Sequence, residues 1–331
     1  MRTTLRALAL FGLFAASFVA STAANPAAAQ SYPNRTVTIV VTSAAGGLTD
    51  VLTRAVGQRL SQMWNQGVVI ENKGGAGHTF AAAAVKSAPV DGYTLLATET
   101  GMFTMQPFLH AKGKLNYDPV NDFVPVAGYA SIPMALLASP NLPARSIAEV
   151  IALAREKPGT LSYGTAGLGT APHMGALLFA SMAGLKLTPI HYRGASPALN
   201  DVIAGHINMI TMGPSIALPT VKAGKLNMLG FGSLKRMPQF PDVPAIAETV
   251  PGYDASVSFG LFAPAGTPPD IVARINADVQ KIIGDADFRA RFLEPQVVQP
   301  LPGPREAFGA YLQAEAAKWS KIIGEAKIQI E

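Results

Sequence analysis

The sequence predicts an α/β protein made of two units, each with a parallel sheet covered by helices. β-Branched runs typical of buried strands alternate with amphipathic segments of helical period, which implies parallel strands joined by helices. The alternation occurs twice, roughly over residues 36–128 and 132–254, and each unit contains a strand, a glycine-containing loop and a helix. Because 49% of the residues are apolar and only 14% are charged, the chain can build a sizeable core.

The first thirty residues have the pattern of an export signal. Arg2 and Arg6 precede an apolar run at 7–20, and small residues at 25–30 offer a cleavage site. The apolar run is shorter than the roughly 20 residues that a membrane-spanning helix needs. We therefore expect a signal peptide at 1–29, cleaved after Ala29, and a mature protein outside the cytoplasm.

The first unit follows a βαβαβ pattern. Strands are expected at 36–42, 68–72 and 93–98, with helices after the loops that begin at Ser43 and Gly74. In the first helix the apolar residues from Leu48 to Met63 recur at helical spacing, which predicts one buried face.

The second unit repeats the alternation and is followed by a helical tail. Strand-like runs at 133–139, 161–165, 187–192, 207–211 and 226–231 alternate with segments at 146–156, 197–205 and 214–224. Ser146 and Glu149 form a capping box. In the tail, Thr267 is expected to cap one amphipathic helix, and a second is expected at 304–324.

Composition and spacing exclude several classes of chemistry. The chain has no cysteine, so disulfides, thiolate nucleophiles and cysteine-bound metals are ruled out. A formal charge of +5 without a Lys/Arg run gives no reason to expect nucleic acid. No G-x-S-x-G motif occurs, and we expect neither a metal nor a cofactor. The histidines lack the spacing of a helical metal pair; they are His78, His110, His173, His191 and His206.

Two loops are the candidate ligand-binding features. Residues 43–50 and 164–173 each join an expected strand to a helix and are rich in Gly, Ala, Ser and Thr. Such loops present backbone N–H groups and the positive end of a helix dipole to an anion. Each loop alone is also compatible with an ordinary capped turn, and neither is a G-x-G-x-x-G motif or a P-loop. Two such loops in two units suggest one anion held between them.

Three side chains near these loops have more than one interpretation. His173 either packs against the second loop or donates to a ligand, and a role as general base has the least support. Asp50 either caps a loop amide or binds a ligand hydroxyl or ammonium group, since it would repel an anion. Arg193 is either an anion contact or a surface charge.

Ordered motifs along the mature chain resemble one family. They include "AGGLTD" (45–50), "VVIENKGGAGHTFAAAAV" (68–85), "GTAGLGTAPHM" (164–174), "HYRGASPALNDVIAGHI" (191–207) and "GLFAPAGTP" (260–268). The chain is similar to the periplasmic substrate-binding proteins of tripartite tricarboxylate transporters, the Bug family. The resemblance implies the type II periplasmic binding protein fold, with two α/β domains, two crossovers and a ligand cleft between them. It places domain 1 at 30–130 plus 255–331 and domain 2 at 131–254.

The resemblance also implies which residues hold a ligand carboxylate, mostly through backbone N–H groups and bridging waters. By position these are Ser43, Ala44, Ala45, Gly46, Gly47, Thr49, Asp50, Thr165, Ala166, Gly167, Gly169, Thr170 and His173. Met212, beside Gly213, stands where the family often has an Asp, which argues modestly against an amino-acid ligand. Met and Phe residues in 98–105 suggest an apolar wall. We therefore expect a mono- or dicarboxylate with a hydrophobic or aromatic body.

The predicted function is that of a non-enzymatic periplasmic receptor. It would close around its carboxylate as a monomer and deliver it to the membrane subunits of a tripartite tricarboxylate transporter. A ligand-loaded partner of a signalling receptor would use the same closed state, so it stays open as an alternative. A periplasmic hydrolase or lyase that uses the loops as oxyanion holes is a further alternative, and it needs a nucleophile or a base beside Thr170 and His173.

Overall fold

The strands form two sheets in a computed structural model that describes residues 32–74, 79–111 and 113–330. The expected signal peptide lies outside these residues, as does part of the glycine-rich turn before the second expected helix. Residues from Arg35 onward belong to one unit of the chain, which contains both sheets. No described helix combines the length and apolar character needed to cross a membrane.

The first sheet has the strand order β11-β4-β10-β3-β1-β2. Strand β1 pairs in parallel with β2 and β3, whereas β10 runs antiparallel to β3 and β4. Its strands are β1 (Val37–Val41), β2 (Val68–Asn72), β3 (Thr94–Glu99), β4 (Phe123–Pro133), β10 (Ser256–Pro264) and β11 (Gln299–Pro300).

The second sheet has the order β7-β6-β8-β5-β9. Strand β6 is parallel to β7 and β8, and β5 is antiparallel to β8 and β9. Its strands are β5 (Ala135–Ala138), β6 (Ser162–Thr165), β7 (Thr188–His191), β8 (Met209–Met212) and β9 (Asn227–Phe231). The parallel pairing that the sequence predicts is therefore present in both sheets, and the strands next to the crossings add antiparallel pairs.

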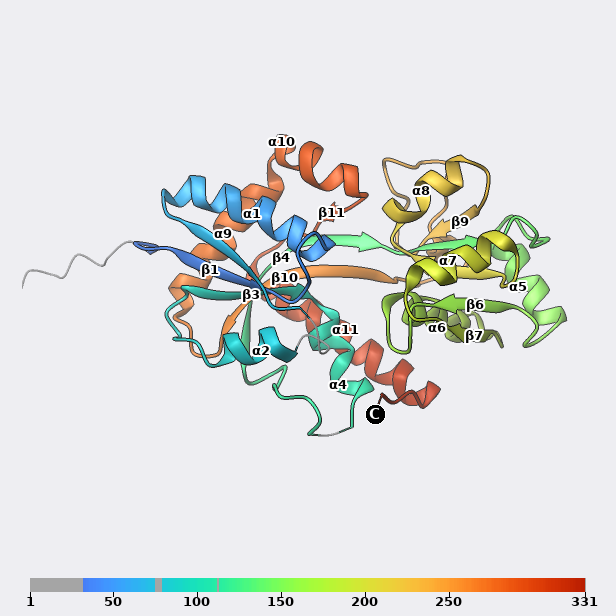
Figure 1. Ribbon diagram of the computed structural model, residues 1–331, viewed down its shortest axis with the longest axis horizontal. Helices are drawn as coiled ribbons and strands as arrows, with labels where there is room; N and C mark the ends of the chain where they lie inside the picture. Colours follow the sequence, from blue (N-terminus) through green and yellow to red (C-terminus); the bar gives the residue numbers. More distant parts are fainter. Residues whose placement is uncertain (1–31, 75–78, 112, 331) are drawn as a thin grey trace, which may run out of the picture. The chain divides into compact units, whose positions relative to one another are not determined.

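The chain passes between the sheets twice. The first passage is at Met134, between β4 and β5, and the second lies between β9 and β10. Both strands of the first sheet that adjoin these passages are long and pair with each other, so they run side by side (Figure 1). The two crossovers of the expected fold are thus present.

Helices cover both faces of the first sheet. Trp64 near the end of α1 donates a hydrogen bond to Asp278 of α9, so these helices share a face. Residues of α2 and α11 share the hydrophobic core around Phe262 on the opposite face (Figure 1). The helices flanking this sheet are α1 (Leu48–Trp64), α2 (Thr79–Lys86), α3 (Gly101–Thr104), α4 (Gln106–Leu109), α9 (Pro269–Gly284), α10 (Ala286–Phe288) and α11 (Arg305–Ala326).

The helices between the strands of the second sheet are α5 (Ile147–Glu156), α6 (Ala171–Ala183), α7 (Ala195–Ala204) and α8 (Pro214–Lys222). Short helical turns complete the chain at Ile246–Glu248, Arg289–Leu293 and Glu294–Gln296. Ser146 caps α5 by accepting a hydrogen bond from the Glu149 amide, as the sequence predicts. The second bond of the expected capping box differs, because the Glu149 carboxylate accepts from the Arg145 amide and not from that of Ser146. Thr267 does not cap α9: Pro268 is the N-cap, and the Thr267 hydroxyl instead donates to the Pro264 carbonyl.

Helix α11 contributes to more than one core. Phe308 near its start packs with Phe262 of the first sheet. Trp319 and Ile322 near its end share a core cluster with Phe179 of α6 and other residues around the second sheet. The helical tail therefore contacts elements of both sheets.

Candidate functional site

The first turn joins β1 to α1 and is held together by Asp50. This carboxylate is only 2% exposed and accepts hydrogen bonds from the Gly46 amide at 2.9 Å, the Asn72 side chain at 2.8 Å and Arg54 at 3.0 Å. Burial acts to raise the pKa of Asp50, but the bonds from Arg54, Gly46 and Asn72 outweigh it and hold the pKa below its usual value. Asp50 thus caps a loop amide, the first of its two interpretations.

The first turn also carries polar groups that have no hydrogen-bond partner within the turn or its helix. The Ser43 hydroxyl is buried and has no hydrogen-bond partner among the described residues. The first intrahelical bond of α1 runs from Val51 to Gly47, so the amides of Leu48 and Thr49 have no acceptor within the helix. Ala44, Ala45 and Gly46 are exposed, and Thr49 is buried.

The second turn joins β6 to α6 and is braced by two threonines. The Thr165 hydroxyl is buried, accepts a hydrogen bond from the Gly167 amide and lies 2.8 Å from His191 Nδ1. Thr170 donates to the Gly167 carbonyl at 2.7 Å. Gly167 and Gly169 have φ values of +125° and +73°, which a residue with a side chain rarely adopts. Ala166 is half-buried between them and Thr165.

His173 supports the second turn from behind. Its Nδ1 accepts a hydrogen bond from the Gly169 amide at 3.1 Å, and its ring stacks on Tyr163. Burial, together with the nearby His191, lowers the pKa of His173 to about 4, so the ring is neutral at pH 7. The structure therefore favours packing against the loop over the other interpretations of His173.

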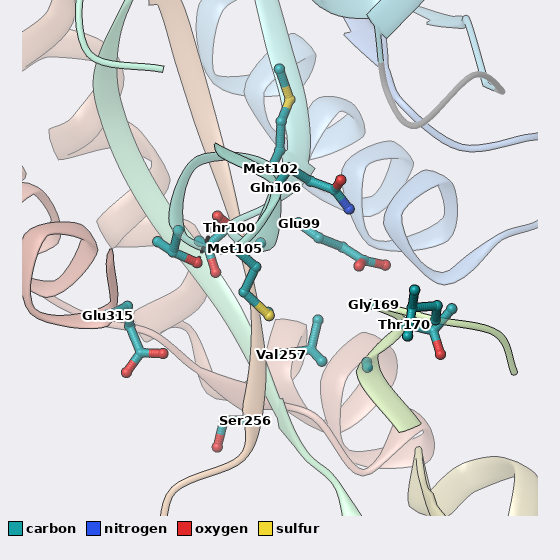
Figure 2. Close-up of a pocket in the computed structure, with 14 residues that line it drawn as sticks. Glu99, Thr100, Met102, Met105, Gln106, Gly169, Thr170, Ser256, Val257 and Glu315 are labelled. Carbon is teal, nitrogen blue, oxygen red and sulfur yellow. Dashed lines mark hydrogen bonds between the residues drawn. The ribbon is translucent and has the colours of Figure 1, made fainter. Parts of the chain in front are cut away.

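A cavity of about 350 Å³ lies beside the second turn (Figure 2). One wall is the second turn with the first residue of α6, and another is the segment that runs from the end of β3 through α3 into α4. β10 and α11 complete the lining. The lining residues are Glu99, Thr100, Gly101, Met102, Thr104, Met105, Gln106, Leu168, Gly169, Thr170, Ala171, Ser256, Val257 and Glu315.

The cavity brings together only some of the residues expected at the site. Gly169 and Thr170 line it, whereas no residue of 43–50 does. Met212 is 1% exposed in the core of the second sheet, and Gly213 precedes α8 beside Ile132, so neither lines this cavity. Arg193 is exposed, which agrees with a surface charge.

Residues 98–105 form a wall of mixed character. Met105 lines the cavity, in agreement with the expected apolar wall, but Met102 has no exposed surface and packs with Phe103 into the core of the first sheet. Sequence reasoning missed Glu99, Gln106, Ser256 and Glu315. Glu99 could have been noticed, because it ends a buried strand at the same sheet edge as the first turn. Ser256 and Glu315 depend on long-range packing and leave no local signal.

Among the residues that the structure describes, no group of three or more His, Asp or Glu side chains is arranged to hold a metal ion. The cavity itself is lined by backbone groups, hydroxyls, the Gln106 amide, apolar side chains and two carboxyl groups.

Comparison with known proteins gives consistent matches over most of the chain. A family model described as "Tripartite tricarboxylate transporter family receptor" matches residues 52–328. A UPF0065 protein from the tcbD-tcbE intergenic region of Pseudomonas sp. strain P51 is 34% identical over 300 residues, covering 90% of this chain and 88% of that protein.

Two solved structures with carboxylates share the fold. Rpa4515 of R. palustris, solved with adipate, is 33% identical with a TM-score of 0.75, covering 90% of this chain and 99% of that one. MatC from Rhodopseudomonas palustris, solved with bound malate, is 32% identical with a TM-score of 0.70, covering 88% of this chain and 100% of that one.

Proposed function

Because the chain belongs to the tripartite tricarboxylate transporter receptor family, we propose that it captures a small carboxylate and delivers it to the membrane subunits of such a transporter. The observation that carries the proposal is the cavity, whose walls come from β3–α4 on one side and from the second turn on the other. A ligand in this cavity contacts residues that follow β3 of the first sheet and residues that follow β6 of the second sheet. Binding therefore favours the conformation in which both walls enclose the ligand.

The second turn supplies the chemistry for a carboxylate. At the start of α6 the amides of Ala171 and His173 have no acceptor within the helix, because Met174 is the first residue bonded back to Thr170. Such amides and the helix dipole favour a negative group. Met105 and Val257 offer apolar surface to the rest of the ligand. The relatives that hold adipate and malate support a mono- or dicarboxylate.

We keep the first turn in the proposed site. Its buried, unpartnered Ser43 hydroxyl and the amides of Leu48 and Thr49 are suited to a ligand or to bridging water. The proposed domains are 30–130 with 255–331, and 131–254. The composition of the two sheets supports this division. The strands of the first sheet lie within residues 37–133 and 256–300, and those of the second lie within 135–231.

The proposal includes export and a purely binding role. Residues 1–29 would be removed as a signal peptide, and the mature receptor would act in the periplasm as a monomer. Its partners would be its carboxylate and the transporter's membrane subunits. Because His173 is buried, neutral and bonded to the turn, it is poorly suited to act as a catalytic base, which supports binding without turnover.

A thermal-shift panel of carboxylic acids, followed by calorimetry, tests this function. A ligand at 100 times its Kd should raise the free energy of unfolding by about 2.7 kcal/mol, which moves the melting temperature by several degrees. Met105→Trp fills part of the cavity and should weaken binding at least about tenfold. Ile216→Trp, at an exposed site outside the cavity, should leave affinity unchanged. Stabilisation by sugars but by no carboxylate would contradict the proposal.

A further inference from the structure

The cavity has an unexpected charge for an anion-binding site. Its lining contains two carboxyl groups, Glu99 and Glu315, and no lysine, arginine or histidine. Glu315 is compensated, because it accepts hydrogen bonds from Lys318 at 2.7 Å and from the Trp319 indole at 3.0 Å. The carboxyl of Glu99 has no hydrogen-bond or ion-pair partner among the described residues.

Glu99 is placed to meet a ligand. It is the last residue of β3, and Figure 2 shows its side chain extending toward the side of the cavity where Gly169 and Thr170 lie. The amides at the start of α6 are on that side, so a ligand carboxylate bound by them shares the cavity with Glu99. Two negative charges about 5 Å apart, at an effective dielectric constant of about 20, disfavour binding on the order of a hundredfold.

The neighbouring ionisable groups do not relieve this repulsion. They already have partners or are uncharged at neutral pH, and they belong to the four elements α1, β4, α6 and α11. They are Asp50 bonded to Arg54, Tyr129 bonded to Thr53, His173 bonded to the Gly169 amide, Tyr311 bonded to Ser258, and Glu315 bonded to Lys318. Burial raises the pKa of the Glu99 carboxyl above its usual value, which favours its neutral form.

Building on the proposed function, we infer that Glu99 is a specificity-determining residue that is protonated in the complex and donates a hydrogen bond to an ionised carboxylate of the ligand. One proton is taken up from solvent when ionised receptor and ionised ligand meet, and it is held between the two carboxyl groups. Binding therefore tightens as pH falls, and the receptor favours acids with a carboxylate at both ends, one for the α6 amides and one for Glu99.

Calorimetry with adipate tests the inference between about pH 6 and 8.5, where the probe stays ionised. At pH values above the pKa of Glu99 in the free protein, the wild-type protein should take up close to one proton for each adipate bound, as measured in buffers of different ionisation enthalpy. Over the same pH range its affinity should fall about tenfold per pH unit. Glu99→Gln keeps a donor without a charge, so its binding should be independent of pH and at least about tenfold tighter than wild type at pH 8. Glu315→Gln is the matched control and should keep the wild-type pH dependence.

Three outcomes would overturn the inference. The first is adipate binding without proton uptake, and the second is an unchanged pH dependence in Glu99→Gln. The third is that at pH 7.5 the wild-type protein binds 6-aminohexanoate more tightly than adipate, whereas Glu99→Gln binds adipate more tightly. That result would mean that ionised Glu99 recognises a cation. A failure of the proposed function looks different: neither protein would bind any acid of the carboxylate panel at any pH, and the inference would fall with it.

Discussion

His173 shows how one side chain can hold a turn of the candidate site in place. The Gly169 amide lies in a turn whose φ of +73° is compatible with glycine, and the imidazole Nδ1 gives that amide an acceptor. An unpaired buried amide would cost about 1–3 kcal/mol. The sequence indicates that a histidine follows the turn, but not which ring nitrogen faces it or that the ring is buried.

The titration of His173 makes the stability of the protein depend on pH. The pKa of about 4 in the folded protein lies below the roughly 6.5 of an unfolded histidine, so the unfolded chain binds more protons between these values. The His173 contribution is fully present above about pH 6.5 and is lost as pH falls toward 4, by at most about 1.4 kcal/mol per unit.

Denaturant unfolding at several pH values between about 4.5 and 7.5 measures this dependence. His173→Asn keeps an acceptor near the Nδ1 position but cannot be protonated, so stability should decline less steeply on acidification than in the wild type. His206→Asn, at an exposed side chain, should keep the wild-type slope. Equal slopes for wild type and His173→Asn would show that the ring is not titrating as described.

At the scale of elements, α11 packs on the first sheet through a pair of glycines. Gly260 of β10 is the cross-strand partner of Gly128 of β4, and both lie under the ring of Phe308. A Cβ on Gly260 would lie 2.9 Å from Phe308 Cε1 and 3.2 Å from the Ala127 carbonyl oxygen. The helix can approach the sheet this closely because neither strand carries a side chain there.

Gly260→Ala should therefore destabilise the protein by about 1–3 kcal/mol through overpacking. Gly284→Ala is a suitable comparison, since Gly284 ends α9 and a Cβ there meets only open space. That substitution should be neutral or stabilise by up to about 1 kcal/mol. Urea unfolding of both variants distinguishes the cases, and similar effects at the two sites would rule out close packing as the cause.

Elements with strong local patterns could be predicted from the sequence, and those fixed by distant partners could not. The β-branched run at 36–42 predicts β1, and the capping box of Ser146 predicts the start of α5. By contrast the local sequence does not predict β4 and β10 as strands, because Pro125, Gly128 and Gly260 interrupt their patterns. These strands are stabilised by pairing with each other across more than a hundred residues.

The candidate site divides in the same way. The second turn can be recognised in the sequence from its glycines, because the left-handed backbone at Gly167 and Gly169 favours glycine. The opposite wall cannot be recognised in this way. Glu99 and Met105 line the cavity because of the register of β3 and the packing of α3 and α4. Ser256 and Glu315 come from the second half of the chain, and only the folded structure brings them to that cavity.

For the whole molecule, the walls of the cavity should respond to ligand together. Hydrogen exchange followed by mass spectrometry, with and without adipate, should show slower exchange in both 99–106 and 168–173. Residues 286–293 lie outside the cavity and should exchange at the same rate in both conditions. Protection confined to one wall would mean that the acid binds on a single surface and is not enclosed.

The contact between the second turn and residues 327–330 has a practical consequence. The Ile330 amide donates to the Leu109 carbonyl, and the side chains of Leu109 and Ile330 both pack against Gly169 (Figure 1 shows this end of the chain beside α4). Since the protein has no cysteine, a single cysteine at exposed Gln329 would take one fluorophore and no other. A dye at that position would be next to Ile330, which packs against the turn proposed to bind the carboxylate, so its fluorescence should report ligand binding.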